Sequence, residues 1–397
     1  NFSLVNAAGL SVNGPLQITS PSGGVSLKTT AGILKVNSVL SAGAVSLDSA
    51  GNLALAHEVS GGLVTLASGG NISQTASGKL TATTLTGHST GSTTLNGSGN
   101  RIGALGSFTA AGFGLTNSQS LAVAGPVNGG ASTTLATSAG NLAINGAVSG
   151  TTTAFDVAGN ISQGAGSVIT ANTLRGNAGG AVALGGNNRI DTLGDVNAAG
   201  FSLKNVQDLT VAGAVNGGAS AGLATTGNLV INGTLTGATT TLDVTGAISE
   251  ASTGSIVAGT LKGDTSGAVS LTGNNRVGAL GDFSAAYLNL RNALSLTVAG
   301  TVNGGTSTTL TTTSGDLTIN GALKGTAMTL DSAGAIGQGS HGVITAATLS
   351  GRSTGVTALN GANHVGTLGS FAAAGLDLTN AQALAVNGPL TIANGGR

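Results

Sequence analysis

The stretch NRIGALGSFTAAGF, residues 100–113, occurs four times in the chain with small changes. The later copies begin at Asn188, Asn275 and Asn363, so successive copies are 88, 87 and 88 residues apart. The second position of every copy is basic, and the four residues there are Arg101, Arg189, Arg276 and His364. A basic residue that returns at a fixed period indicates either a chemical site presented four times or a mark of the architecture.

A second landmark has the same long period. It is the pentapeptide GNISQ, which with its variants GAISE and GAIGQ ends at Gln74, Gln163, Glu250 and Gln338. Self-similarity at a fixed period is the signature of a repeat architecture. We therefore predict a single β-solenoid rod over residues 1–397, built of repeats of about 88 residues. The segments are an atypical first part at 1–71, then 72–160, 161–247 and 248–335, and a partial repeat at 336–397.

A shorter period lies inside the long one. The first aliphatic residue after each Gly/Asn turn recurs at nearly equal steps, as at Leu209, Leu229 and Ile248, but one step in each repeat is longer, as from Ile161 to Ile190. At ~3.3 Å per residue, about 20 residues suffice for three short strands and their turns. The spacing predicts an all-β fold, a parallel β-helix (β-solenoid) of about 18 coils of ~19–22 residues, with a longer 29-residue coil every fourth. The crossover rule for parallel strands makes it right-handed.

The composition favours strands over helices and excludes several classes of function. The 397 residues include 70 glycines, and each glycine inside a helix costs roughly 1 kcal/mol relative to alanine. Thirteen basic and 13 acidic residues cancel, whereas a nucleic-acid-binding surface needs a basic surplus on one face. No apolar run approaches the ~18 residues of a membrane helix. The absence of cysteine excludes disulfides and thiolate metal sites.

The apolar residues are placed as a stacked interior requires. In GNLAINGAV, Leu142 and Ile144 point one way while the residues between and after them point the other way. Six of the seven phenylalanines occupy two recurring positions, and Phe155 is the exception. The two sets are Phe108, Phe283 and Phe371, and Phe2, Phe113 and Phe201. We predict that both sets fill the interior.

In these repeats the sequence resembles the repeat region of filamentous-haemagglutinin-type exoproteins, the large adhesins of bacterial two-partner secretion. The resemblance covers essentially the whole chain and is carried by GNISQGAGSVITANTLRG, LTGNNRVGALGDF, and LTVAGAVNGGAS with GNLVINGTLTG. It implies a right-handed parallel β-helix, export through an outer-membrane transporter, and a role in adhesion or biofilm. Autotransporter passenger domains are a neighbouring possibility. Because the Asn-Pro-Asn-type motifs of the secretion domain do not occur, we expect shaft rather than export signal or tip.

The basic column is the first candidate site. It would serve as a ladder of cations for a polyanionic glycan or a lipid headgroup. In the alternative interpretation, each basic residue bonds neighbouring carbonyls at a turn and keeps the surface soluble. No acid accompanies the column consistently, because Asp191 follows Arg189 but the other copies have glycine there. Placed every fourth coil, the cations would lie roughly 19 Å apart, beyond the ~8 Å Debye length, so we favour the architectural interpretation.

An enzyme is the second possibility, because polysaccharide lyases and hydrolases also use parallel β-helices. Glycoside hydrolysis requires two carboxyl groups about 5–9.5 Å apart. The densest cluster of charges consists of Asp191, Asp195 and Asp208 with Arg189 and Lys204. The interval from Asp191 to Asp208 is shorter than one coil, and a solvated face explains the cluster. We predict that the protein is not an enzyme.

The remaining candidates are turn residues. The pair His57-Glu58 has no second histidine within reach for a metal, and His88 and His341 are isolated. The pairs Gly129-Gly130 and Gly217-Gly218 follow asparagine, and a phosphate cradle would need a helix after them. Asn-x-Ser/Thr sequences, which this composition produces by chance, occur at Asn71, Asn96, Asn160 and Asn232. We predict no catalytic, cofactor-binding or metal-binding residues.

The first functional hypothesis is the shaft of a secreted bacterial adhesin or extracellular fibre, a rigid spacer for surface attachment or biofilm matrix. Its partners would be a host or abiotic surface, a glycan or the matrix, and its location extracellular or on the cell surface. The ends NFSLVNAAGLSVNGPL and LDLTNAQALAVNGPLTI share one phase of the repeat, which predicts a segment of a longer solenoid or a self-stacking filament subunit. Two further hypotheses are a carbohydrate-active enzyme and an ice-binding face of threonines, such as 151–153 and 311–313.

Overall fold

In the computed structural model, residues 1–393 are described, and every helix or strand among them is a β-strand. The chain divides into two compact units. Unit 1 comprises residues 1–192 and 197–199, and unit 2 comprises residues 193–196 and 200–393. The single rod over the whole chain stays a prediction, and the last repeat, 336–397, is described as far as residue 393.

The strands are short and follow one another closely. Those of unit 1 are β1 (Phe2–Asn6), β2 (Leu10–Val12), β3 (Leu16–Gln17), β4 (Gly24–Thr29), β5 (Leu34–Val36), β6 (Leu40–Ser41), β7 (Ala44–Ser49), β8 (Leu53–Leu55), β9 (Glu58–Ser68), β10 (Ile72–Gln74), β11 (Lys79–Ser89), β12 (Ser92–Leu95), β13 (Arg101–Thr109), β14 (Gly112–Asn117), β15 (Leu121–Val123), β16 (Val127–Asn128), β17 (Ser132–Thr137), β18 (Leu142–Ile144), β19 (Val148–Val157), β20 (Ile161–Gln163) and β21 (Ile169–Ala178). Strand β22 (Ala181–Asn197) has residues in both units.

Unit 2 continues in the same manner. Its strands are β23 (Gly200–Asn205), β24 (Leu209–Val211), β25 (Ala214–Asn216), β26 (Ser220–Thr225), β27 (Leu229–Ile231), β28 (Thr234–Val244), β29 (Ile248–Glu250), β30 (Ser255–Thr265), β31 (Ala268–Ser284), β32 (Tyr287–Asn292), β33 (Leu296–Val298), β34 (Val302–Asn303), β35 (Ser307–Thr312), β36 (Leu317–Ile319), β37 (Ala322–Ser332), β38 (Ile336–Gln338), β39 (Val343–Ser353), β40 (Val356–Ala373), β41 (Gly375–Asn380), β42 (Ala385–Val386) and β43 (Leu390–Ile392).

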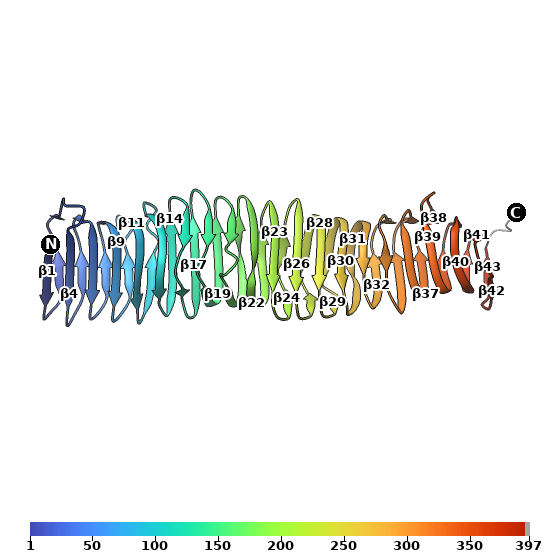
Figure 1. Ribbon diagram of the computed structural model, residues 1–397, viewed down its shortest axis with the longest axis horizontal. Helices are drawn as coiled ribbons and strands as arrows, with labels where there is room; N and C mark the ends of the chain where they lie inside the picture. Colours follow the sequence, from blue (N-terminus) through green and yellow to red (C-terminus); the bar gives the residue numbers. More distant parts are fainter. Residues whose placement is uncertain (394–397) are drawn as a thin grey trace. The chain divides into compact units, whose positions relative to one another are not determined.

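In each unit, successive coils of three strands stack in parallel, as the arrows of Figure 1 show. We use the word column for residues that pair in register on successive coils. One column of unit 1 contains, in order, Leu10, Leu34, Leu53, Ile72, Thr93, Phe113, Thr133, Thr153 and Leu174. The predicted right-handed parallel β-helix is confirmed, with about 20 coils.

The predicted 29-residue coil is wrong. On the coil that follows Ile161, the residue in register is Val182 rather than Ile190. The cause is visible in unit 2, where four coils lead from Ile248 to Met328, through Val269, Leu288 and Thr308. The repeat partner of Ile248 is Ile336, which lies beyond Met328 on a different strand of the coil. One repeat is therefore four coils plus one strand, and the apparent long step is a change of face.

The interior forms by alternation of buried and more exposed residues along the short strands. Leu142 and Ile144 are fully buried whereas the residues beside them are not, as predicted. The phenylalanines at both recurring positions are buried, except Phe2, which is 40 % exposed in the first coil. Phe155 is buried as well, although it lies outside both sets. The ring centroids of Phe108 and Phe113 lie 4.7 Å apart, so one phenylalanine from each set contacts the other across a corner of the coil.

Glycine occupies the position that pairs with each phenylalanine of the first set. Gly351 pairs with Phe371, and a Cβ added there would lie 2.2 Å from the Leu330 carbonyl oxygen and 3.0 Å from Phe371 Cε2. Gly87 and Gly263 stand in the same relation to Phe108 and Phe283, each on the following coil. The large ring on one coil thus requires the smallest residue on the coil before it.

Replacing Gly351 by alanine is expected to lower the free energy of unfolding by about 1–3 kcal/mol, because the added methyl group overpacks the interior. Gly337 provides the control in unit 2, since nothing lies within 4 Å of a Cβ added there. Denaturant unfolding of the full chain measures both variants. Equal effects of the two substitutions would contradict the packing described for Gly351.

Candidate functional site

The two recurring landmarks of the sequence bind each other. In unit 1, Gln74 Nε2 donates to Asn100 Oδ1 at 2.6 Å, and Asn100 Nδ2 donates back to Gln74 Oε1 at 3.0 Å. The same reciprocal pair joins Gln163 to Asn188 and, in unit 2, Gln338 to Asn363. We call each of these pairs an amide corner. The fourth amide corner has Glu250 opposite Asn275.

The asparagine of an amide corner also bonds backbone groups of its own coil and of the two neighbouring coils. Asn100 is fully buried, and its Oδ1 accepts the N–H of Leu80 at 2.8 Å. Its Nδ2 donates to the carbonyl oxygens of Leu95 at 2.9 Å and Thr116 at 3.0 Å. A buried backbone group without a partner costs about 1–3 kcal/mol. The side chain therefore closes the coil at a bend where strand pairing stops.

A second asparagine supports three of the amide corners from the following coil, and at two of them, Asn117 and Asn292, it is fully buried. Asn117 accepts the N–H of Ile102 at 2.8 Å and donates to the carbonyl of the same residue at 2.9 Å. Asn292 and Asn380 make the same two bonds, to Val277 and Val365 respectively. An amide side chain thus takes the place of a neighbouring strand where the ladder is interrupted.

The sequence did not single out these amides as candidates, although both landmarks contain them. The signal that would have found them is the number of residues from the glutamine or glutamate to its asparagine. This separation is 26 in the first repeat and 25 in the other three. Two polar residues that keep a constant separation slightly longer than one coil are placed to meet at one corner. The recurring stretch marks the architecture of the coil.

The basic column does not form a ladder. The four basic residues are all exposed. Within unit 2, the column of His364 runs through Thr345, Lys324 and Asn303 to Ser284. Ser284 lies on the same strand as Arg276, β31, but not at the same position. These are different columns, because each repeat advances by one strand. The prediction that the column recurs at the same place every fourth coil is therefore wrong.

The acidic residues of the predicted cluster act on the backbone of the next coil. Asp195 Oδ1 accepts the N–H of Ala214 at 2.8 Å, and Asp208 Oδ1 accepts that of Asn228 at 2.6 Å. Asp191 belongs to unit 1, whereas these two belong to unit 2. Asparagines at the same turns make the same bond, so a turn function accounts for the carboxylates of Asp195 and Asp208.

The other predicted turn residues lie in turns or at the surface. His57 is exposed and its Nδ1 accepts the N–H of Glu58 at 2.9 Å, while His88 and His341 are exposed. Gly130 and Gly218 both have φ of 53°, which only glycine adopts readily. Side-chain oxygens of two Asn-x-Ser/Thr sequences accept from the next coil, at Asn71 and Asn160. Over residues 1–393, no three His, Asp or Glu side chains gather as a metal site would require.

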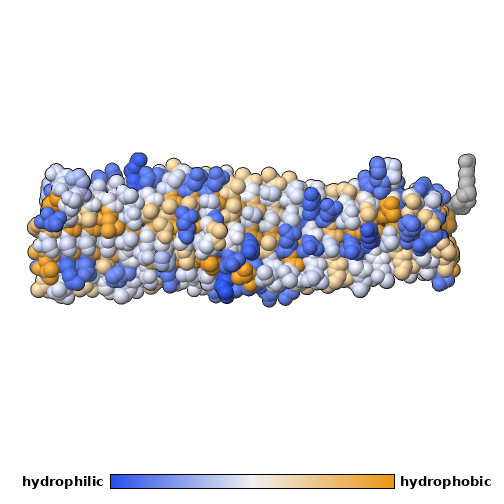
Figure 2. Space-filling view, viewed as in Figure 1, coloured by the Kyte–Doolittle hydropathy of each residue, from blue (hydrophilic) through white to orange (hydrophobic). Residues whose placement is uncertain are grey.

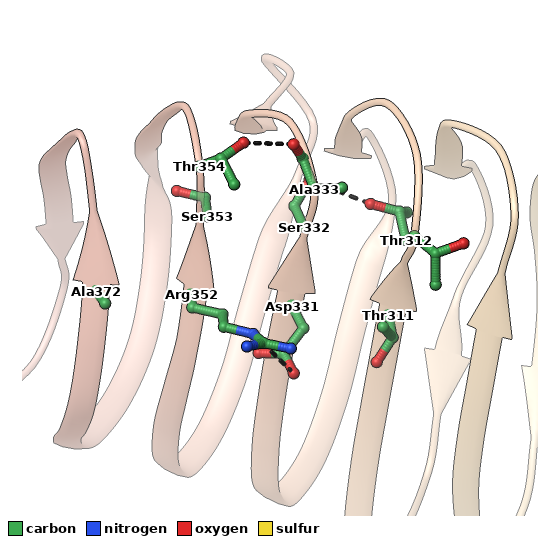
Figure 3. A pocket seen from close by; sticks show the side chains of 10 residues that line it. Thr311, Thr312, Asp331, Ser332, Ala333, Arg352, Ser353, Thr354 and Ala372 are labelled. Atoms are coloured by element: carbon green, nitrogen blue, oxygen red, sulfur yellow. Dashed lines mark hydrogen bonds and ion pairs between the residues drawn. The ribbon is translucent and has the colours of Figure 1, made fainter.

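Shallow grooves cross the coils in both units. In unit 2, a groove of about 470 Å³ crosses the coils around Asp331 and Arg352, whose Oδ2 and Nε atoms lie 3.7 Å apart (Figure 3). Thr312 Oγ1 lies 3.1 Å from Ser332 Oγ beside this pair. A groove of about 580 Å³ in unit 1 is lined by the residues two repeats earlier, with Asp156 and Asn177 at the equivalent places. Each groove contains one carboxylate, fewer than the pair that glycoside hydrolysis requires.

The exposed surface mixes polar and apolar residues in small patches, as Figure 2 shows for one face. Like Asp331 with Arg352, Lys28 and Asp48 form an exposed ion pair, at 2.7 Å. Exposed pairs of this kind contribute about 0–1 kcal/mol. Stability therefore depends on the interior and on the amide corners rather than on surface charges.

Among residues 1–393, the structure has no helix long and apolar enough to span a membrane. No protein-family model matches the sequence, and neither a curated protein nor a solved structure is significantly similar to it.

Proposed function

We propose that the protein is a structural shaft, part of a secreted bacterial adhesin or extracellular fibre of the filamentous-haemagglutinin type. The observation that carries the proposal is that the recurring polar residues form buried hydrogen bonds to the backbone. Asn100 and Asn363 are buried and bond the backbone of the preceding coil, so the features that the sequence repeats hold the coils together. In this chain the repeated feature is a set of structural hydrogen bonds rather than an exposed binding site. Such a repeat is suited to a spacer.

The advance of each repeat by one strand supports the same proposal. Within unit 2, equivalent exposed residues such as Arg276 and His364 lie in different columns. Repeated surface residues are thereby distributed around the coil instead of forming one continuous binding face. Because each coil contacts only its neighbours, such a stack gains length without needing a larger core.

The resemblance to filamentous-haemagglutinin repeats extends the proposal to location and partners. We propose an extracellular or cell-surface location, export through an outer-membrane transporter, and contact with a host or abiotic surface, a glycan or the biofilm matrix. We also propose that the protein is not an enzyme, because Asp195 and Asp208 bond turn backbone and each groove has a single carboxylate.

Electron microscopy of the full chain at rising concentration tests the shaft. About 20 coils at ~4.8 Å per coil predict single rods roughly 95 Å long. Filaments of indefinite length would favour the self-stacking subunit instead, and globular particles would contradict the proposal. Release of reducing sugar from soluble polysaccharides by the same sample would replace the shaft with a carbohydrate-active enzyme.

A further inference from the structure

One amide corner contains an acid where the other three contain an amide. Glu250 occupies the position of Gln74, Gln163 and Gln338 in the second landmark. Its Oε2 accepts two hydrogen bonds, one from the N–H of Gly273 at 2.7 Å and one from Asn275 Nδ2 at 2.8 Å. Gln338 Oε1 accepts the equivalent two bonds, from Gly361 at 2.8 Å and Asn363 at 3.0 Å. Glu250 Oε2 thus replaces the amide oxygen, and Oε1 replaces the amide nitrogen.

The orientation of Asn275 is fixed by its backbone partners. The N–H of Ile256 donates to Asn275 Oδ1 at 2.8 Å. Asn275 Nδ2 donates to the carbonyls of Leu271 and Arg291, both at 3.2 Å. Turning the amide over would break all three bonds. Asn275 Oδ1 must therefore occupy the place where, in the other corners, the asparagine oxygen accepts a hydrogen bond from the glutamine.

An ionised Glu250 has no hydrogen to donate to Asn275 Oδ1, unlike the glutamines of the other corners. In the corner of Gln338, Nε2 donates to Asn363 Oδ1 at 2.7 Å. At the equivalent place Glu250 has Oε1, which is buried and has no hydrogen-bond partner. A carboxylate is an acceptor only, whereas a protonated carboxyl group supplies one donor. Two acceptors that face each other in a buried site are unfavourable, and a proton on Oε1 restores the missing bond.

We propose that Glu250 is held as the neutral acid, with Oε1–H donating to Asn275 Oδ1, and that this corner is a proton-dependent latch on unit 2. The protonated latch completes the same hydrogen bonding as the glutamine corners. Ionisation removes one bond and places a charge against Asn275 Oδ1, which loosens the turn between β29 and β30 and the bend at residues 271–275.

The surroundings of Glu250 favour the neutral form. Burial raises the pKa of the Glu250 carboxyl above its ordinary value, and the hydrogen bonds from Asn275 and Gly273 oppose this with a smaller effect. Strand β27, which pairs with β29, carries no charged residue. Arg291 of β32 directs Nη1 to the Gly273 carbonyl at 3.1 Å. The remaining charged residues of β28, β30 and β31 are Asp243, Lys262, Asp264, Arg276 and Asp282.

The direction of the pH dependence follows from the raised pKa. Between the ordinary pKa of glutamate and the raised pKa in the fold, the folded protein binds more protons than the unfolded chain. The latch therefore contributes fully below the ordinary value and is progressively lost as pH rises toward the raised one. Inside this window the equilibrium between closed and open corner changes by up to about tenfold per pH unit.

The chain offers a direct reporter, because Glu58 and Glu250 are its two glutamates. In the full chain labelled with carboxyl-¹³C glutamate, two resonances are expected, and E58Q identifies the one from Glu250. We expect the Glu250 resonance to titrate above the ~4.3 of an exposed glutamate. A midpoint at or below that value would overturn the proposal.

Amide hydrogen exchange tests the latch itself. Across the window, protection of the Ile256 and Gly273 amides is expected to fall with rising pH in the parent protein relative to E250Q. The reverse substitution Q338E is expected to create the same dependence at Ile344 and Gly361. E250Q recreates the composition of the other corners, so it is expected to fold. If E250Q keeps the dependence of the parent protein, or if Q338E creates none, the latch is refuted.

Discussion

Replacing Asn363 by alanine is expected to lower the free energy of unfolding by about 3–5 kcal/mol. The side chain bonds the N–H of Ile344 at 2.9 Å and the carbonyls of Leu359 and Thr379 at 3.0 Å. It also makes both bonds to Gln338, at 2.7 and 3.0 Å. Alanine leaves these groups buried without partners, each at a cost of about 1–3 kcal/mol. Denaturant unfolding of the full chain measures the effect.

The adjacent residue provides the control for Asn363. His364 is exposed, so H364A is expected to change stability by no more than about 0.5 kcal/mol. The two substitutions separate the interpretations of the recurring stretch, because one removes its buried first residue and the other its basic second residue. Comparable losses in the two variants would contradict the role given to the amide corner.

Replacing Phe283 by alanine is expected to cost about 3–5 kcal/mol, the range for truncating a buried aromatic side chain. Phe283 is 2 % exposed and pairs with Gly263 on one side and Val302 on the other. The glycine leaves room for the ring, and neither neighbour can fill the cavity that alanine would create. Unfolding in denaturant, followed by circular dichroism, measures the loss.

A graded series strengthens the test at Phe283. Val196 occupies the equivalent position one repeat earlier, so F283V is expected to cost less than F283A. T309A, on an outward-facing position of β35, is expected to change stability by no more than about 0.5 kcal/mol. A small effect of F283A, similar to that of T309A, would contradict the buried position of the ring.

Much of the fold was predictable because alternation and period are local properties of the sequence. Leu142 and Ile144 showed which side of a strand faces inward, and the regular spacing of such aliphatic residues gave the length of a coil. The 29-residue coil was wrong because Ile161 and Ile190 follow similar Gly/Asn turns but lie on different strands of the coil. Similar turns occur at all corners, so turn residues alone do not tell which face a strand occupies.

The amide corners were harder to predict from the sequence. Asn100 follows Gly99 in a stretch typical of an exposed turn, and Arg101 beside it attracts attention by its charge. The burial of Asn100 depends on backbone groups of Leu80 and Thr116, which reach it from neighbouring coils. The register between coils determines these contacts, and that register was incorrect wherever a long coil was assumed.

Cysteine pairs in this cysteine-free chain test most directly the claim that the coils are of nearly equal length, with no long coil among them. The structure pairs Ser162 with Ala183, whereas a 29-residue coil would pair Ser162 with Asp191. All three side chains are exposed, and residues in register on adjacent strands are within the ~4.4–6.8 Å that a disulfide spans between Cα atoms. Oxidation is expected to form an intrachain disulfide in S162C/A183C and none in S162C/D191C. The reverse result would contradict a repeat of four coils plus one strand.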